Sequence, residues 1–259
     1  MEQNKFRVFK YGGFAGVFFA NNATAMFYNG AGDNSVSRIL LVPEIRDNIE
    51  VELNRTYELG EMPKKMKYNP SNCLGFYGSY FLNEKNAINV DIGFTRLKSS
   101  SVFRLDYTNL PPDHLTDDTY FMGEIYGEEK RYLIDFGYQH FWAVGNKIDF
   151  YAEAGITFSN VEVIASKIKI GNLEYNIKTN YTNPNAIQQY GDVKQGQVGM
   201  GAYAVAGLEY QFNPSISIEP VLKVYYSQNR LPDFDEMYFH FAPSIRIAFK
   251  AMFEVIREE

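Results

Sequence analysis

Apolar and polar residues alternate along the C-terminal part of the chain, from Gly201 to Phe249. Between Ile216 and Tyr226 every even-numbered position is apolar, whereas the odd-numbered positions include Glu219 and Lys223. Successive side chains of a β-strand point to opposite faces, so this stretch predicts a strand with one apolar and one polar face. An apolar face about ten residues long, backed by ionisable groups, is typical of a strand between lipid and a polar barrel interior.

The same alternation predicts strands in earlier parts of the chain. The inward or outward assignment of the first strand is ambiguous, because Phe18 and Phe19 cannot both face lipid. Altogether we expect eight strands, at residues 11–22, 73–82, 87–96, 130–142, 148–159, 201–212, 215–228 and 238–249.

The connections between these strands alternate in length. Tight turns are expected at Asn83–Asn86, Gly145-Asn146 and Asn213-Pro214, and a shorter loop at 229–236. Long connections are expected at about 30–70, 99–129 and 164–199, and a polar tail at 250–259. This asymmetry predicts one all-β domain over 1–259: an up-and-down antiparallel transmembrane β-barrel of eight strands, with short periplasmic turns and long extracellular loops. Eight strands bring both termini to the periplasmic side.

Two of the long connections have patterns of their own. Residues 43–59 fit a short helix with Pro43 near its first turn, or a strand in which Ile49, Val51 and Leu53 alternate with acidic residues; both remain open. Residues 167–170 and 173–177 flank Gly171-Asn172, a favourable two-residue turn, and predict a hairpin.

Composition narrows the class of protein. Aromatic residues make up 16% of the chain, with 20 Tyr and 21 Phe, which is typical of a barrel with aromatic girdles at both membrane interfaces. No apolar run reaches the length of a transmembrane helix. The net charge of -6 argues against a nucleic-acid partner. The N-terminus has no apolar signal core, so we expect an exported chain of this sequence to be the mature form.

One hairpin resembles a known family. Gly207-Leu208-Glu209-Tyr210, the Asn213-Pro214 turn and the alternating strand after it are similar to a hairpin of the outer-membrane protein A transmembrane domain and its eight-stranded relatives. The resemblance covers about the C-terminal fifth at motif level and the whole chain only as a pattern. The first long loop and the residues past Phe249 depart from that family. The resemblance implies a bacterial outer-membrane protein, and the Asn-, Tyr- and Lys-rich composition is similar to proteins of Bacteroidota.

Ionisable residues recur at inward positions of the predicted strands. Opposite charges there are expected to pair, because an unpaired buried charge costs several kcal/mol. Side chains just fill an eight-stranded barrel, so we expect a structural ionic network and a plugged interior, with a narrow solute channel as the alternative. The predicted network consists of Arg131, Asp135, Asp149, Glu153, Glu209, Glu219, Lys223 and Arg246.

Candidate catalytic and metal-binding groups are few. Barrel deacylases of lipid A use a His-x-Ser pair on a lipid-facing strand, whereas His240 and Ser244 are four residues apart and share the inner face. His140 has outward parity, where it would anchor at the membrane interface. His114 lies among Asp113, Asp117 and Asp118 without EF-hand spacing, which predicts a solvated acidic loop. Cys73, the single cysteine, is expected to be a small inner-face residue and permits no disulfide. We therefore expect no catalytic site, cofactor or metal.

The expected function follows from these exclusions. A lipocalin-like carrier also has eight up-and-down strands, but its interior is apolar, the inverse of the arrangement here. We expect a non-enzymatic outer-membrane barrel that acts through its loops as a structural or accessory protein, with a subunit of a secretion or surface-transport complex as one candidate role. Expected partners are outer-membrane lipid, lipopolysaccharide, and other outer-membrane or periplasmic proteins. A lipid-modifying barrel enzyme is the alternative from another class.

Overall fold

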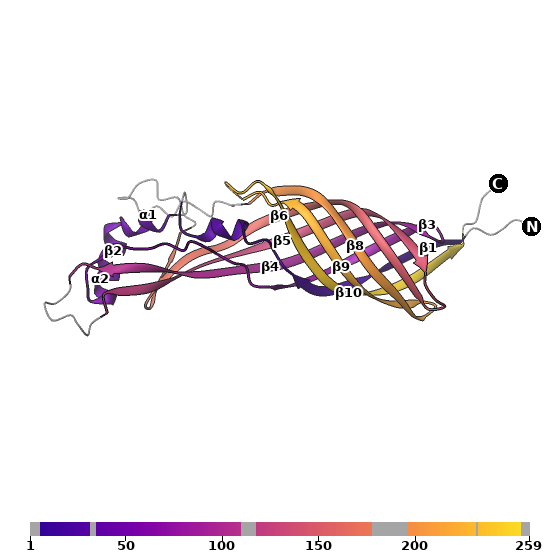
Figure 1. The fold of residues 1–259 in the computed structure, drawn as a ribbon, viewed down its shortest axis with the longest axis horizontal. Coiled ribbons are helices and arrows are strands. Elements are labelled where there is room, and N and C mark those ends of the chain that lie inside the picture. Colours follow the sequence, from indigo (N-terminus) through magenta and orange to yellow (C-terminus); the bar gives the residue numbers. More distant parts are fainter. Residues whose placement is uncertain (1–5, 32–34, 110–117, 178–195, 232, 255–259) are drawn as a thin grey trace, which may run out of the picture.

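The computed structural model describes residues 6–31, 35–109, 118–177, 196–231 and 233–254. Most of these residues belong to one antiparallel sheet, and the helices α1 and α2 lie alongside the part of it farthest from the chain termini (Figure 1). The elements are β1 (Phe6–Phe18), η1 (Thr24–Tyr28), α1 (Val36–Leu40), α2 (Pro43–Leu53), β2 (Tyr57–Leu59), β3 (Ser71–Asn83), β4 (Asn86–Tyr107), β5 (Tyr120–Ala143), β6 (Ile148–Ile170), β7 (Leu173–Asn176), β8 (Val198–Asn213), β9 (Ile216–Gln228) and β10 (Met237–Glu254).

Eight of the strands close into a ring. Each of β1, β3, β4, β5, β6, β8, β9 and β10 pairs with its neighbours in chain order, and β1 pairs with β10 from Phe6↔Glu254 onward. β2 and β7 stand outside the ring and pair with β4 and β6. The predicted up-and-down antiparallel barrel of eight strands is therefore confirmed.

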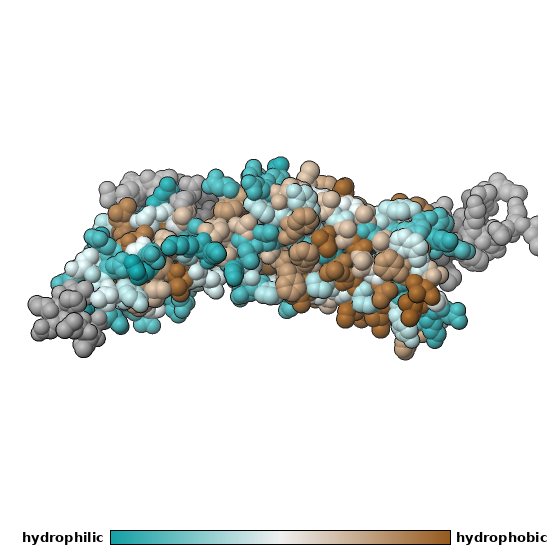
Figure 2. Space-filling view, in the orientation of Figure 1, coloured by the Kyte–Doolittle hydropathy of each residue, from teal (hydrophilic) through white to brown (hydrophobic). Residues whose placement is uncertain are grey.

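The wall of this barrel is apolar outside and polar inside. On β10, Ile245 is 55% exposed, whereas its neighbour Arg246 is 1% exposed. Large hydrophobic side chains cover the barrel half of the molecule, and polar side chains dominate the opposite half (Figure 2). A surface of this kind suits a hydrocarbon surrounding.

The tight turns lie at the end of the barrel where the chain begins and ends. The β3–β4, β5–β6 and β8–β9 connections span only a few residues, as predicted, and lie near the N- and C-termini in Figure 1. The helices α1 and α2 lie at the opposite end. We refer to these as the turn end and the helix end.

Three strands are much longer than the sequence analysis expected. β4 continues to Tyr107, β5 begins at Tyr120 and β6 continues to Ile170, so the predicted connections at 99–129 and 164–199 are strand over much of their described length. The reason is that the apolar residues change from the outward to the inward positions along each strand. Inside the barrel, inward residues such as Thr95 are polar; two residues further along β4, the inward residue is Leu97, and Phe103 follows on the same face. Beyond the apolar wall the outward face becomes polar. An alternation that expects apolar residues at the outward positions therefore no longer identifies the strand.

Both ends of the ring also differ from expectation. The first strand is 6–18 rather than 11–22, with Phe18 buried and Phe19 exposed. The last strand extends to Glu254, so 250–254 is strand rather than tail, while 255–259 lie outside the described residues. The reason is the closing ladder, in which Lys250 is the register partner of Lys10 and polar residues continue the inner face.

The extension of β4, β5 and β6 has helices beside it and buried apolar residues on its inner face. The open choice at 43–59 resolves as helix α2, which begins at Pro43 and ends at Leu53. Asn54 caps it in the left-handed conformation (φ 50), and the short strand β2 follows. Ile49 of α2 is fully buried, as are Ile125 and Ile168 of the sheet. No helix in the described ranges has the length and apolar character needed to cross a membrane.

The predicted hairpin at 167–177 is present. β6 ends at Ile170 and β7 begins at Leu173, with Gly171 at a positive φ of 57°. Oε1 of Glu52, from α2, accepts hydrogen bonds from the backbone N–H of Asn172 (2.8 Å) and its side-chain amide (3.0 Å). These contacts join α2 to the hairpin. We call residues 20–69, 97–129 and 161–177, where described, the outer module.

Candidate functional site

The centre of the barrel holds a cluster of buried charges. Arg246 Nη2 lies 2.7 Å from Asp91 and its Nη1 lies 3.4 Å from Glu153. Lys223 Nζ pairs with Asp91 and lies 2.8 Å from Asp135. Asp91 and Asp135 are directly opposite on β4 and β5, where like charges repel, so Lys223 from the far wall offsets that repulsion.

A second cluster lies nearer the turn end. Lys10 Nζ lies 2.6 Å from Glu219 and 3.0 Å from Glu209, and Lys250 lies 2.8 Å from Glu209. The Tyr151 hydroxyl donates to Glu219 at 2.9 Å. The two clusters are linked, because Arg246 also contacts the Tyr151 hydroxyl at 3.3 Å.

The structure brings together most of the predicted inner residues. Asp135, Glu153, Glu209, Glu219, Lys223 and Arg246 belong to the two clusters. Asp149 is half-buried and receives a hydrogen bond from Gln211 at 3.4 Å. Arg131 lies in a separate group at the helix end, with Glu129.

Three charged residues of the two clusters were missing from the predicted network: Lys10, Asp91 and Lys250, which was expected to lie in the polar tail. Lys10 was overlooked because the first strand was expected to begin at Tyr11, although Lys10, Gly12, Phe14 and Gly16 share one parity. Asp91 lies on the inward parity of its predicted strand, so strand periodicity alone identifies it.

The interior is filled by side chains. The cavity between Asp91, Lys223, Tyr225 and Arg246 has a volume of about 10 Å³, room for about one water molecule. Aromatic rings cover the cations: Arg246 lies 4.8 Å from the ring centre of Tyr77. This arrangement favours a sealed barrel over an open path for solutes.

A third polar group closes the barrel at its helix end. Buried Glu129 accepts hydrogen bonds from the hydroxyls of Tyr28 (2.7 Å) and Tyr68 (2.9 Å), and pairs with Arg131 Nε at 2.6 Å. Arg131 Nη2 also donates to Thr24 at 3.3 Å, so both ends of η1 are held. Burial, together with the charge of Glu129, raises the pKa of Tyr28 and of Tyr68, which keeps both hydroxyls protonated as donors. We call this group the mouth cluster.

The histidine and cysteine candidates occupy structural positions. His240 is 1% exposed; its Nδ1 accepts from the Asn21 backbone at 3.0 Å, and its Nε2 lies 2.8 Å from the Asn229 amide. Both ring nitrogens of His240 are thus engaged, and Ser244 is half-buried on the same strand. Nδ1 of His140 lies 2.6 Å from the Asn86 amide oxygen, beside Trp142.

The remaining candidates are Cys73, His114 and groups of acidic residues. Cys73 is buried on the inner wall. His114 lies outside the described residues. Within the described ranges, no three His, Cys, Asp or Glu side chains are grouped as metal ligands.

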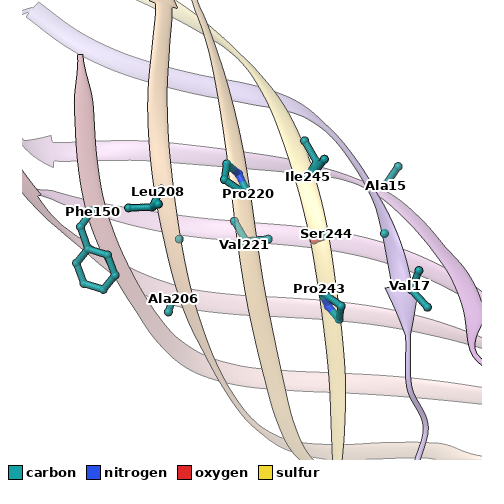
Figure 3. Close-up of a pocket in the computed structure, with 12 residues that line it drawn as sticks. Ala15, Val17, Phe150, Ala206, Leu208, Pro220, Val221, Pro243, Ser244 and Ile245 are labelled. Carbon is teal, nitrogen blue, oxygen red and sulfur yellow. The ribbon is translucent and has the colours of Figure 1, made fainter.

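The outer wall is hollowed where prolines interrupt the ladder. Pro220 and Pro243 lie on neighbouring strands β9 and β10 and line a groove of about 690 Å³ with Ala15 of β1 (Figure 3). Proline has no N–H to donate, and the β1–β10 register stops at Gly16↔Ser244 before a bridge at Phe19↔Phe241. This part of the wall therefore combines small side chains with missing ladder bonds.

Comparisons with known proteins give distant structural likenesses. No protein-family model matches the chain, and no curated protein matches it in sequence. The chain is similar in structure to Neisserial surface protein A (9% identity, 94% of this chain and 96% of that chain, TM-score 0.44). It is also similar to OprG from Pseudomonas aeruginosa (10%, 96% and 96%, TM-score 0.43) and to Ail, the attachment invasion locus protein of Yersinia pestis (8%, 95% and 98%, TM-score 0.41). These likenesses assign no residue role, and the eight-stranded ring rests on the strand pairing.

Proposed function

We propose that the chain is a non-enzymatic outer-membrane β-barrel that holds a rigid module outside the cell and contacts other macromolecules through it. The ring of strands, with its apolar outside and charged inside, is the part that crosses the membrane. The helix end faces outward, because the short turns of such barrels lie on the periplasmic side.

The observation that carries this proposal is the length of β4, β5 and β6. These strands have 22, 24 and 23 residues, whereas a membrane crossing needs about 9–11. On β5, the outward apolar side chains of the barrel begin at Tyr132, so residues 120–131 project beyond the wall by about 40 Å. A projection of this length is not needed for anchoring, and its inner face is buried, as Phe103 and Ile125 show.

The outer face of the projecting sheet is the surface we assign to contact. It carries exposed Val102, Tyr120 and Met122 beside charged side chains, with Arg104 stacked over the Tyr120 ring at 5.9 Å. Aromatic, Met and Arg side chains are those that protein interfaces enrich. The packed interior argues against transport as the main activity. Both ring nitrogens of His240 have hydrogen-bond partners, which argues against hydrolysis.

Site-specific photo-crosslinking in intact cells tests the proposal. A crosslinking residue replaces Met122 (46% exposed) on the outer module or, as the matched control, Ile156 (53% exposed) on the lipid-facing wall. We expect a discrete protein adduct at position 122, identified by mass spectrometry, and only lipid adducts at 156. The identity of that adduct also tests the role as a secretion or surface-transport subunit.

Two results would contradict the proposal. One is the absence of protein adducts at position 122 while the protein resides in the outer membrane. The other is recovery of the native chain in the soluble fraction, which would remove the barrel's membrane role altogether.

A further inference from the structure

The membrane-facing wall carries a second groove, of about 900 Å³, that follows β1 toward the helix end. The groove runs along two small outward residues of β1, each of which has large residues on both neighbouring strands. Gly13 has Ile247 and Phe76 as register partners on either side, and Ala15 lies between Ile245 and Leu74 in the same way. Neighbouring strands lie about 4.8 Å apart, so the large side chains form two ridges about 10 Å from each other.

Two glycines of this groove differ in whether the protein itself leaves room for a side chain. A Cβ on Gly75 would lie 2.4 Å from the Phe14 ring, which covers the inner side of the wall, so Gly75 is required by internal packing. A Cβ on Gly13 would meet nothing closer than a backbone oxygen at 3.5 Å, an ordinary contact. Because the protein itself leaves room for a side chain at Gly13, the space outside it is open to another occupant.

At the helix end the groove meets a row of cations. Phe94 and Tyr132 line the groove there, with ring centres 5.4 Å apart. The next outward residues on the same two strands are Arg96 and Lys130, register partners of like charge, about 7 Å further along. Like charges directly opposite are unfavourable unless an anion lies between them or nearby.

Further cations widen this row. Lys98 is exposed on β4. The segment before β3 lies beside it, where the backbone N–H of Asn69 donates a hydrogen bond to the carbonyl oxygen of Lys98 at 2.9 Å. That segment exposes Lys65 and Lys67, because Met66 and Tyr68 turn inward. Glu128 pairs with Arg96, and half-buried Glu162 is the register partner of Lys130. The five exposed or half-buried cations of this row outnumber Glu128 and Glu162, the two acids that pair with or lie opposite the strand cations, in a chain whose net charge is -6.

The geometry points to a binding site for one phosphate-bearing lipid of the outer leaflet, its acyl chain in the β1 groove and its phosphate at Arg96, Lys98 and Lys130. The groove lining is apolar and lies in the lipid-facing wall, which suits a hydrocarbon chain. Phosphate oxygens form charge-assisted hydrogen bonds with Arg and Lys, and cations near a membrane surface attract anionic headgroups. This inference rests on the proposed membrane location and adds a ligand class to it.

Lipid retention tests the site. The full chain is inserted into phosphatidylcholine vesicles that contain phosphatidic acid with the same acyl chains, extracted in mild detergent, and the lipids it keeps are counted by native mass spectrometry. We expect the wild type to retain phosphatidic acid in preference to phosphatidylcholine. The double variant Lys98→Gln/Lys130→Gln should lose about tenfold or more of that preference. The variant Gly13→Leu should retain less of both lipids, because its side chain fills the groove.

Matched controls separate the site from general effects. Lys85→Gln removes an exposed cation at the turn end, and Ala154→Leu places the same leucine side chain at an exposed wall position outside the groove; neither should change retention. Equal retention of both lipids by the wild type overturns the lipid site, as does an effect of Lys85→Gln equal to that of the double variant. A dimer that Gly13→Leu converts to monomer would give the groove to a second copy instead. Failure of the wild type to insert would contradict the proposed function, and the site with it.

Discussion

Buried tyrosine hydroxyls in the outer module differ in whether they have a partner. The Tyr28 hydroxyl donates to Glu129, whereas the Tyr57 hydroxyl is buried without a partner within the described residues. Tyr28→Phe should ease opening of the mouth cluster by about 1–3 kcal/mol, because Glu129 loses a donor it cannot replace with water. Tyr57→Phe should leave stability unchanged or raise it. Hydrogen exchange of the η1 amides measures the first effect, and thermal unfolding of the module the second. A destabilising Tyr57→Phe would contradict the assignment.

Alkaline pH should loosen the module through the same side chains. Burial raises the pKa of Tyr57 from 10.0 to about 12, and that of Tyr28 and Tyr68 in the same direction. Between pH 10 and 12 the opened state loses the Tyr57 proton while the closed state keeps it, so the opened state binds fewer protons and stability falls as pH rises. The near-ultraviolet circular dichroism of tyrosine should report this loss. Tyr57→Phe should reduce it; a loss already complete at pH 9 would point to other groups.

At the residue scale, the sequence predicts which charged residues face the barrel interior, but it does not predict which of them form salt bridges with each other. Alternation alone places Glu219, Lys223 and Arg246 on the inner face, because strand periodicity needs no knowledge of the fold. It cannot say that Lys223 reaches across the barrel to Asp135, since that contact depends on how the ring closes. Lys10 was missed through a strand boundary, the least reliable feature of such patterns.

At the element scale, η1 depends on a glycine in β5. A Cβ on Gly127 would lie 2.1 Å from the Tyr28 ring, so Gly127→Ala must displace η1 from the helix end of the barrel, at a cost of about 1–3 kcal/mol for overpacking. Faster hydrogen exchange in η1 and easier proteolysis near it are expected. Gly145→Ala is the matched control, because nothing lies within 4 Å of its new Cβ. Equal effects of the two substitutions would show that η1 does not depend on this contact.

The long strands show where sequence patterns stop working. Inside the barrel, outward apolar positions reveal a strand; beyond it, the apolar positions turn inward and belong to the buried core, as Phe103 and Ile125 do. When only the outward positions of β4 are followed, the apolar pattern ends at Arg96, and the residues after it are predicted to be a loop. The helix at 43–53 was undecided for a related reason, since Ile45, Ile49 and Leu53 fit helical spacing while 49–53 also alternate.

At the scale of the whole molecule, the barrel should not conduct. Its central cavity has room for about one water molecule, and the mouth cluster covers the helix end. In planar bilayers we expect no steady ion current from the inserted wild-type protein. Insertion is checked by protection of the barrel strands from protease. A stable current from protected protein would contradict the sealed interior and revive the channel alternative.

The ladder between β1 and β10 has a consequence for biogenesis. Its register joins Phe6 to Glu254, nearly the full length of the described chain, so the ring cannot close until the last strand has been synthesised and delivered. Contacts between such distant residues form slowly, and an unclosed sheet exposes two strand edges that pair readily with other chains. The edges of β1 and β9 must therefore be kept from pairing with other chains until β10 arrives, and a chain truncated before β10 is expected to remain an open, aggregation-prone sheet.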